Sequence, residues 1–231
     1  MTTLLPPNHG TGPGPITADG CAVEYYATLQ PNGEPELIHG AIPAAASILE
    51  LGAGTGRITH RLVELGHEVV AVDQSPEMLA HITGVETVCS SIESLKLERR
   101  FDLVLLMSFV IETADDGQRA AFLATCRRHV TGGGSVILQR HPPEWYDELE
   151  PIERQLDDGR TFRLGGLSHP APDLLAATTE YTIGERRWTH FFVSKRLDDA
   201  QFEHELERAD LTIVEFIDGD REWVRAIPRP T

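Results

Sequence analysis

Residues 48–56 read ILELGAGTG, an apolar run that ends in an acid and then opens into three closely spaced glycines. Glycine lets the backbone approach a ligand more closely than any residue with a Cβ atom allows. A second apolar run, over residues 69–72, is followed at once by Asp73. A carboxylate at this place can accept hydrogen bonds from ribose hydroxyls. The two segments together predict a nucleoside-binding turn.

The spacing of the glycines narrows the ligand class. The dinucleotide fingerprint carries glycines at the first, third and sixth positions of its turn. Here Gly52, Gly54 and Gly56 occupy the first, third and fifth positions, and Arg57 fills the sixth. A bulky cation at that position hinders the close packing of helix against strand that a dinucleotide fold needs. The spacing therefore favours a ligand without a pyrophosphate over NAD.

The string E-L-G-x-G-x-G from Glu50 to Gly56, with Asp73 and the QSPEML segment after it, closely resembles motifs of class I S-adenosylmethionine-dependent methyltransferases. The resemblance implies S-adenosylmethionine as cofactor, with the glycine turn against its methionine part and Asp73 on its ribose hydroxyls. The expected donor-binding residues before the fourth strand are Glu50, Gly52, Ala53, Gly54, Asp73, Gln74, Met78, Ser91 and Ile92.

Several of these residues have a structural alternative. Asp73 could instead cap the helix that Pro76 begins. Glu50 either orients the glycine turn or, as in many family members, binds the cationic amino group of the donor through water. Met78 either packs on the adenine face or belongs to the core.

The adenine end departs from the family pattern. Where the family often carries an acid beside the adenine amino group, this chain has Ser91. The Ser91 hydroxyl could still accept a hydrogen bond from the adenine amino group, and the Ile92 backbone could reach a ring nitrogen. The alternative is that Glu93 supplies the acid beside the amino group. A neutral hydrogen bond contributes roughly 1 kcal/mol, against about 1.5–3 kcal/mol for a charged one, so we expect a somewhat lower affinity.

Continuous apolar runs are typical of parallel strands covered on both faces. Such strands alternate with helices, which predicts a doubly wound, mostly parallel α/β sheet of seven strands, Rossmann-like as in the methyltransferase family. The expected strands are 47–51, 68–72, 85–89, 101–107, 135–139, 211–216 and 223–227, and the expected helices are 59–65, one that begins at 76, 118–129 and 199–209.

The alternation of strands and helices stops after the fifth strand. Segments 160–164, 175–183 and 187–195 read as strands with no helix between them, and Gly184 lies where a hairpin turn would be. We expect an antiparallel insertion over residues 142–197, which by family resemblance covers the acceptor pocket or makes a dimer contact. The expected organisation is one methyltransferase domain over 23–231 behind a flexible arm, residues 1–22, that is rich in proline and glycine.

Composition excludes several partners. The formal charge of −16 repels phosphate backbones and anionic lipid, so we expect neither nucleic acid nor a membrane as partner. The three cysteines have no metal-ligand spacing, so we expect no metal site and no disulfide framework. The sequence shows no signal peptide and no run near the roughly 20 apolar residues of a membrane span. These features predict a cytoplasmic protein.

Catalytic candidates follow the fourth and fifth strands. Met107 and Ser108 end the fourth strand, where ligands of open α/β sheets bind, and could face the methyl group. His141 could take a proton from a nucleophile, because histidine titrates near neutrality; the alternative is a plain loop residue. Tyr25 and Tyr26 lie in the segment that folds over the donor in similar small-molecule enzymes; the alternative is packing of the first helix.

The acceptor side is less defined. An aromatic pocket could be lined by Glu144, Trp145, Tyr146, Trp188 and His190, although such residues more often pack between elements. The expected function is methyl transfer from S-adenosylmethionine to a nitrogen or oxygen nucleophile of a small metabolite. The oligomeric state stays open, with a homodimer as one option. The alternatives are an NAD(P)-dependent oxidoreductase and a non-catalytic protein that binds S-adenosylmethionine.

Overall fold

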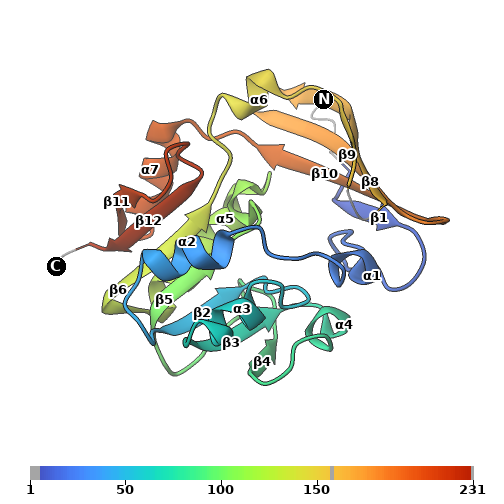
Figure 1. The fold of residues 1–231 in the computed structure, drawn as a ribbon. Coiled ribbons are helices and arrows are strands. Elements are labelled where there is room, and N and C mark those ends of the chain that lie inside the picture. The colour runs from blue at the N-terminus through green and yellow to red at the C-terminus, as the bar shows by residue number, and fades with distance from the viewer. Residues whose placement is uncertain (1–5, 157–158, 230–231) are drawn as a thin grey trace. The chain divides into compact units, whose positions relative to one another are not determined.

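The structure is a computed structural model that describes residues 6–156 and 159–229. The chain divides into two compact units (Figure 1). Unit 1 combines the N-terminal segment up to Thr28 with Glu144–Arg196. Unit 2 combines Leu29–Pro143 with the segment that starts at Leu197. The antiparallel insertion and the N-terminal segment therefore share one unit.

Unit 2 contains a seven-stranded sheet in the order β11-β12-β6-β5-β2-β3-β4. The pairs from β4 to β6 are parallel, whereas β12 is antiparallel to both β6 and β11. This arrangement confirms the doubly wound, mostly parallel sheet that the sequence predicts. The strands are β2 (Ser47–Leu51), β3 (Glu68–Asp73), β4 (Glu86–Cys89), β5 (Phe101–Leu106), β6 (Val130–Gln139), β11 (Leu211–Phe216) and β12 (Trp223–Pro228).

Local capping sets where the helices of unit 2 begin. The Ser75 side chain accepts a hydrogen bond from the Met78 N–H, so α4 starts where the sequence predicts. Asp198 and Gln201 form a reciprocal capping box at the start of α7. The helices are α2 (Glu34–Gly40), α3 (Thr59–Glu64), α4 (Pro76–Leu79), the 3₁₀ helix η1 (Val110–Glu112), α5 (Asp116–His129) and α7 (Asp199–Arg208).

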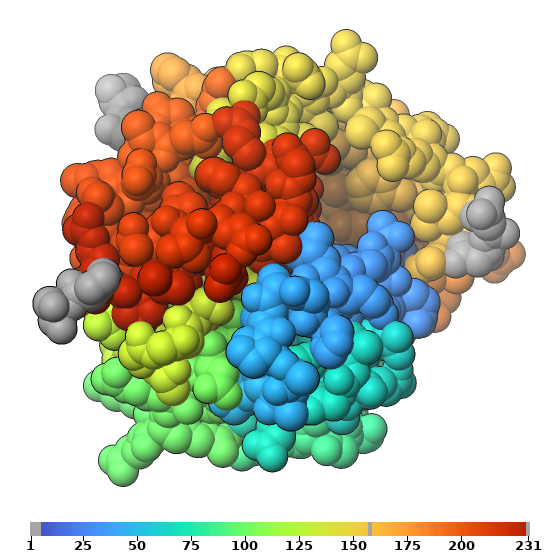
Figure 2. Space-filling model, turned by 60° about the vertical axis from the view of Figure 1, so that its left-hand side comes forward, coloured from blue at the N-terminus to red at the C-terminus, as the bar shows by residue number. Residues whose placement is uncertain are grey.

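The sheet of unit 2 is covered on both faces. In β2, Leu49 belongs to a core shared with α5 and α7, whereas the adjacent Ile48 belongs to a second core shared with α2 and α3. Because neighbouring side chains point to opposite faces, both must be apolar. Trp223 and Ile38 pack into the second core, and Figure 2 shows their segments, red and light blue, side by side.

Unit 1 contains a five-stranded antiparallel sheet in the order β1-β10-β9-β8-β7. Four of its strands follow β6 in the chain, which confirms the antiparallel insertion after the fifth predicted strand. The elements are β1 (His9–Thr11), α1 (Val23–Tyr26), α6 (Trp145–Glu148), β7 (Ile152–Gln155), β8 (Arg160–Ala171), β9 (Leu174–Ile183) and β10 (Arg186–Lys195).

Strand β1 corrects the expectation of a flexible arm over residues 1–22. His9 pairs with Phe191 and Thr11 pairs with Thr189, so residues 9–11 form an edge strand. The Asn8 side chain also accepts a hydrogen bond from the Val193 N–H at 3.0 Å. A segment rich in proline and glycine gives no local sign of pairing with a distant strand. Residues 1–5 of the expected arm lie outside the described residues.

Candidate functional site

The glycine turn leaves open space beside the carboxyl end of β2. Gly52 and Gly54 adopt positive φ angles of 72° and 56°. A Cβ atom added at either position would meet no atom within 4 Å, so a ligand could lie directly against this backbone. Gly56 differs, because a Cβ atom there would come within 2.8 Å of Ile82. The first two glycines thus leave room for a ligand, and the third permits internal packing.

Asp73 ties the glycine turn to the start of α4. One carboxylate oxygen accepts the Gly54 N–H at 2.8 Å, and the other accepts the Ser75 N–H at 2.9 Å. The second bond supports the structural alternative, in which the acid helps to begin the helix. Each carboxylate oxygen can accept two hydrogen bonds, so Asp73 can also receive ribose hydroxyls. Its role in ribose binding stays a prediction.

Glu50 lies under the turn as a buried acid. Its carboxylate accepts a hydrogen bond from Thr59 Oγ1 at 2.6 Å, which connects β2 to the first residue of α3. Burial raises the pKa of Glu50 to about 7; the Thr59 hydrogen bond and the charge of Arg57 oppose this rise, and the charge of Asp73 adds to it. The contact with Thr59 supports the role of orienting the turn, and a cationic amino group would favour the ionised form.

The segment expected at the adenine lies beside Asp73, because the Ser90 N–H donates to the Asp73 carbonyl at 3.0 Å. The Ser91 hydroxyl forms a local turn, accepting the Ser94 N–H at 3.3 Å. The carboxylate of Glu93 accepts a hydrogen bond from Gln118 at 2.8 Å. The adenine-binding roles of this segment stay predictions.

The other expected donor residues differ in exposure. Ile92 is half-buried and its carbonyl accepts the Thr125 hydroxyl at 2.9 Å. Met78 is buried, which suits the core alternative, and Gln74 is exposed. Ala53 is buried and its N–H donates to the Val72 carbonyl. Their contact with the donor stays a prediction.

The chain takes an unusual backbone path after β5. Met107 is buried, and Ser108 and Phe109 then adopt positive φ angles of 55° and 60°. Such angles are uncommon for residues with side chains, cost roughly 1–3 kcal/mol each, and cluster at functional sites. The Gln139 side chain holds this bend by accepting the Ser108 N–H at 2.8 Å, and it donates to Glu222 at 2.6 Å.

His141 lies at the carboxyl end of β6 and is held by residues that follow β5. Its Nδ1 atom is 2.8 Å from one carboxylate oxygen of Glu112, and its backbone N–H donates to the other. The Phe109 ring stacks on the imidazole, with ring centroids 3.7 Å apart and planes at 9°. The side chain of His141 is 16% exposed and that of Glu112 is 5% exposed.

Glu112 is the functional candidate that the sequence analysis misses. It is a lone acid in the run FVIET after the fourth strand, and its partner His141 lies 29 positions further along the chain. An acid within an apolar run, close to the end of a strand, is the signal that could have found it.

Tyr25 and Tyr26 belong to unit 1. Tyr25 is buried and stacks on Tyr181 with ring centroids 4.1 Å apart, as the packing alternative expects. Burial, with smaller contributions that include Cys21, raises the pKa of Tyr26 well above its usual value, so the phenol stays protonated. Contact of either tyrosine with the donor stays a prediction.

Two aromatic residues expected at the acceptor pocket instead pack within unit 1. Trp188 is fully buried and donates its indole N–H to the Pro13 carbonyl at 2.7 Å. Tyr146 is buried, with its hydroxyl 2.7 Å from Ser194 Oγ. The sequence could not separate these uses, because a large aromatic side chain serves a core and a pocket equally well.

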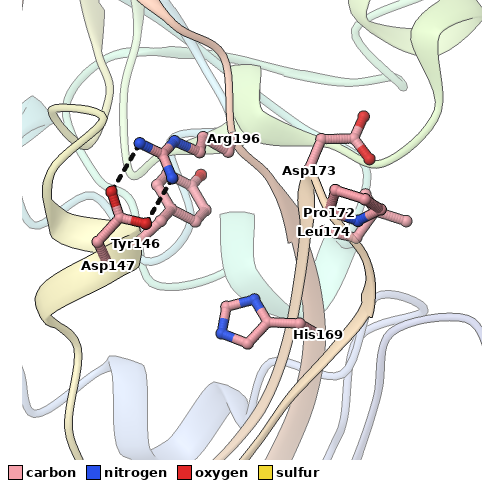
Figure 3. Close-up of a pocket in the computed structure, with 7 residues that line it drawn as sticks. All are labelled: Tyr146, Asp147, His169, Pro172, Asp173, Leu174 and Arg196. Carbon is pink, nitrogen blue, oxygen red and sulfur yellow. Dashed lines mark hydrogen bonds and ion pairs between the residues drawn. The ribbon is translucent and has the colours of Figure 1, made fainter.

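Unit 1 also carries a hollow of about 230 Å³, including space open to solvent (Figure 3). Arg196 spans part of it and makes two hydrogen bonds to Asp147, at 2.6 and 2.7 Å. These charges already neutralise each other, so we assign no ligand to the hollow. Its lining residues are Tyr146, Asp147, His169, Pro172, Asp173, Leu174 and Arg196.

Among the described residues, no three His, Cys, Asp or Glu side chains are arranged to hold a metal ion. No helix within residues 6–156 and 159–229 is long and apolar enough to cross a membrane.

Comparison with known proteins shows what this chain is similar to. Residues 48–134 match the model of a methyltransferase domain. An uncharacterized methyltransferase of Mycobacterium tuberculosis is 56% identical over 61 residues, which are 26% of this chain and 25% of that protein. This chain therefore spans about a quarter of that relative's length.

Two solved structures share the fold. A S-adenosylmethionine-dependent methyltransferase from Clostridium acetobutylicum superposes with a TM-score of 0.73 at 16% identity, over 89% of this chain and 95% of that one. A sugar N-methyltransferase from Streptoalloteichus sp. superposes with a TM-score of 0.75 at 19% identity, over 94% and 98%.

The sheet order, the glycine turn and the acid that ends β3 define a nucleoside-binding α/β domain. Residues 48–134 match the methyltransferase-domain model, and the chain has the fold of the S-adenosylmethionine-dependent methyltransferases, the family of its structural neighbours. S-adenosylmethionine is the cofactor of this family. The open space beside Gly52 and Gly54 fits such a molecule, because the backbone there can contact a ligand without displacing a side chain.

Proposed function

We propose that this protein transfers a methyl group from S-adenosylmethionine to a nitrogen or oxygen nucleophile of a small metabolite. The main supporting observation is the open space at Gly52 and Gly54 beside the carboxylate of Asp73. The fold similarity to a sugar N-methyltransferase supports a small-molecule acceptor and a nitrogen nucleophile. An acidic protein also suits a neutral or cationic acceptor better than a polyanion.

In the proposed complex, the glycine turn lies against the methionine part and the ribose, and Asp73 accepts the ribose hydroxyls. Glu50 balances the charge of the amino group, and Ser91 and Ile92 contact the adenine. The other proposed donor contacts are Ala53, Gln74, Met78 and Met107. When bound, the donor supplies an electrophilic methyl group on a sulfonium, whose sulfur keeps the bonding electrons as a thioether.

The proposed acceptor side lies beyond the ends of β5 and β6, the edge of open α/β sheets where ligands bind. His141 is the proposed base: its Nε2 atom receives the proton that the nitrogen or oxygen nucleophile loses as its new bond to carbon forms. A base of this kind typically contributes about 10²–10⁴ in rate. Orientation of the nucleophile and exclusion of water supply much of the remainder. We propose that Tyr25, Tyr26 and the insertion cover this side.

Calorimetry tests the proposal first, with S-adenosylmethionine, its demethylated product and NADH as titrants. Binding of the first two and not of NADH supports it; binding of NADH alone supports the oxidoreductase alternative. A screen of metabolites with methyl-labelled donor follows. Donor binding without transfer to any nitrogen or oxygen nucleophile in the screen would support the non-catalytic alternative.

A matched pair of glycine variants tests the turn. Gly54→Val should abolish donor binding, because the added side chain fills the space next to the turn. Gly184→Val is the control, since Gly184 has a similar φ of 60° and equally open surroundings in the β9–β10 hairpin. The strain from a positive φ should be similar in both variants. Equal donor affinity in the two would contradict the assignment of the turn.

A homodimer is part of the proposal. Sedimentation velocity at micromolar concentration tests it, since a monomer and a dimer of a 25.5 kDa chain separate clearly. A single species of monomer mass would contradict this part alone.

A further inference from the structure

We propose that Glu112 is the positioning residue of His141. It holds the imidazole in the tautomer that carries its hydrogen on Nδ1, and it thereby leaves Nε2 able to receive a proton. This inference rests on the proposed function, in which His141 is the base. Glu112 itself has no contact with the reacting atoms in this proposal and acts only through the histidine.

The first argument is the attachment at two points. One oxygen of Glu112 accepts the His141 backbone N–H, and the other lies 2.8 Å from Nδ1. An ionised carboxylate has no hydrogen to donate, so Nδ1 must supply the hydrogen of this bond. In a neutral ring, Nε2 is then the nitrogen that carries no hydrogen.

The second argument is the charge near Glu112. Arg140 is buried, with 2% exposure, and lies 3.0 Å from Asp199. Burial lowers the pKa of Arg140, and attraction to Asp199 and to Glu112 opposes that fall. Arg140 therefore places a positive charge near the carboxylate of Glu112.

The third argument is the stacking of Phe109 on the imidazole of His141. The Phe109 ring lies 3.7 Å from the imidazole and nearly parallel to it, so the ring cannot turn without losing this contact. Phe109 takes a positive φ of 60° to reach this place. The uncommon backbone conformation persists because Gln139 holds the preceding N–H, of Ser108.

A plain structural role makes a different prediction. If Glu112 only anchored the loop, its bond to the backbone N–H would suffice, and the tautomer of His141 would not depend on it. Glu112→Gln separates the two roles. The glutamine oxygen can still accept the backbone N–H, whereas its amide group presents hydrogens to Nδ1 and favours the opposite tautomer.

The experiment is long-range ¹H–¹⁵N NMR of His141 in the full chain, at a pH where the ring is neutral. We expect the Nδ1–H tautomer in the wild type and the Nε2–H tautomer in Glu112→Gln. Glu215→Gln is the control, because Glu215 also accepts two hydrogen bonds, from Arg225 at 2.9 and 2.7 Å. An Nε2–H tautomer in the wild type, or an unchanged tautomer in Glu112→Gln, would overturn the proposal.

Kinetics with an identified acceptor then separates this inference from the proposed function. Glu112→Gln should lower kcat by about 10²-fold or more while the donor dissociation constant stays unchanged, and Glu112→Asp should recover part of the loss. A switched tautomer with full activity would confirm the positioning and refute His141 as the base. A lowered kcat with an unchanged tautomer would refute the positioning.

Discussion

The carboxylate of Glu50 accepts a hydrogen bond from Thr59 Oγ1 at 2.6 Å while only 4% of Glu50 is exposed. This contact joins the end of β2 to the helix after the glycine turn. It places a titratable group with a pKa of about 7 at the end of β2, next to the glycine turn. Two pH-dependent properties follow from that raised pKa.

Stability should fall as the pH rises from 4.5 to 7. In this window the folded protein keeps a proton on Glu50 that the unfolded chain has lost, because the ordinary pKa is 4.5 and the folded value is about 7. Above pH 7, the raised pKa of Glu50 lowers the free energy of unfolding by about 3 kcal/mol. Glu50→Gln lacks this cost, so urea unfolding should show a gain in stability over the wild type at pH 8 and little gain at pH 4.5. Equal gains at both pH values would contradict the raised pKa.

Donor binding should release a proton from Glu50 near pH 6. The cationic amino group of the donor favours the ionised carboxylate, so binding lowers the pKa of Glu50 and releases up to about one proton. Calorimetry in two buffers of different ionisation enthalpy measures this number, and Glu50→Gln should reduce it to zero. The same proton release from wild type and variant would remove Glu50 from the amino-group site.

Asp73→Ala should weaken donor binding by about 1–3 kcal/mol, because charge-assisted hydrogen bonds to the ribose are lost. Asp102→Ala is a matched control: Asp102 also accepts two hydrogen bonds, from the Ser47 N–H and hydroxyl, at the opposite ends of the parallel strands. It should reduce stability without changing the dissociation constant in calorimetry. If both variants bind the donor as the wild type does, Asp73 has only the structural role.

His141→Ala should lower kcat by about 10²-fold at saturating donor, since a general base is lost. The donor dissociation constant should change little, because His141 is not among the proposed donor contacts. His204→Ala, at an exposed position of α7, controls for the loss of a histidine. Equal activity in the two variants would reduce His141 to a scaffold residue.

Tyr25→Phe and Tyr26→Phe test the expected cover over the donor. Each keeps the ring and removes only the hydroxyl, so the stack of Tyr25 on Tyr181 should persist. If one hydroxyl contacts the reactants, that variant should lower turnover by roughly tenfold, the equivalent of about 1.4 kcal/mol, with its melting temperature unchanged. Tyr181→Phe, in the same cluster, is the control. Full activity of both variants would leave the tyrosines with packing alone.

The sequence predicts the parts of the fold that local features define. Buried parallel strands need apolar residues on both faces, so β2 and β3 are visible as short apolar runs. Ser75 and Pro76 together mark the start of α4, and Gly184 marks the β9–β10 turn. Each of these signals lies within a few residues of the element that it defines.

Elements that depend on distant partners could not be predicted in this way. Strand β7 reads IERQ, lies at the edge of its sheet beside β8 and is largely exposed, so no apolar pattern reveals it. Strand β8 continues past Leu164 to Ala171 through two register shifts, which a simple alternation of side chains does not predict. Strand β6 begins at Val130. Three glycines follow within the strand, and glycine does not indicate a strand, so the sequence does not show where β6 begins.

The candidate site shows the same division. The glycine turn and Asp73 are recognisable because their spacing in the sequence is characteristic. The sequence identifies His141 as a candidate. Glu112 can be recognised as its partner only in the folded structure, where β5 and β6 lie side by side. Hydrogen bonds between residues far apart in the chain have no signature in either segment alone.

The pairing of β1 with β10 has a consequence for biosynthesis. Phe191 lies about 180 positions after His9, so the ribosome must complete most of the chain before the first strand can find its partner. Until then the unpaired β1 can template contacts with other chains, and a completed β10 that lacks β1 presents an open edge. Removing the first eleven residues should therefore increase aggregation during expression, even though the glycine turn is left intact.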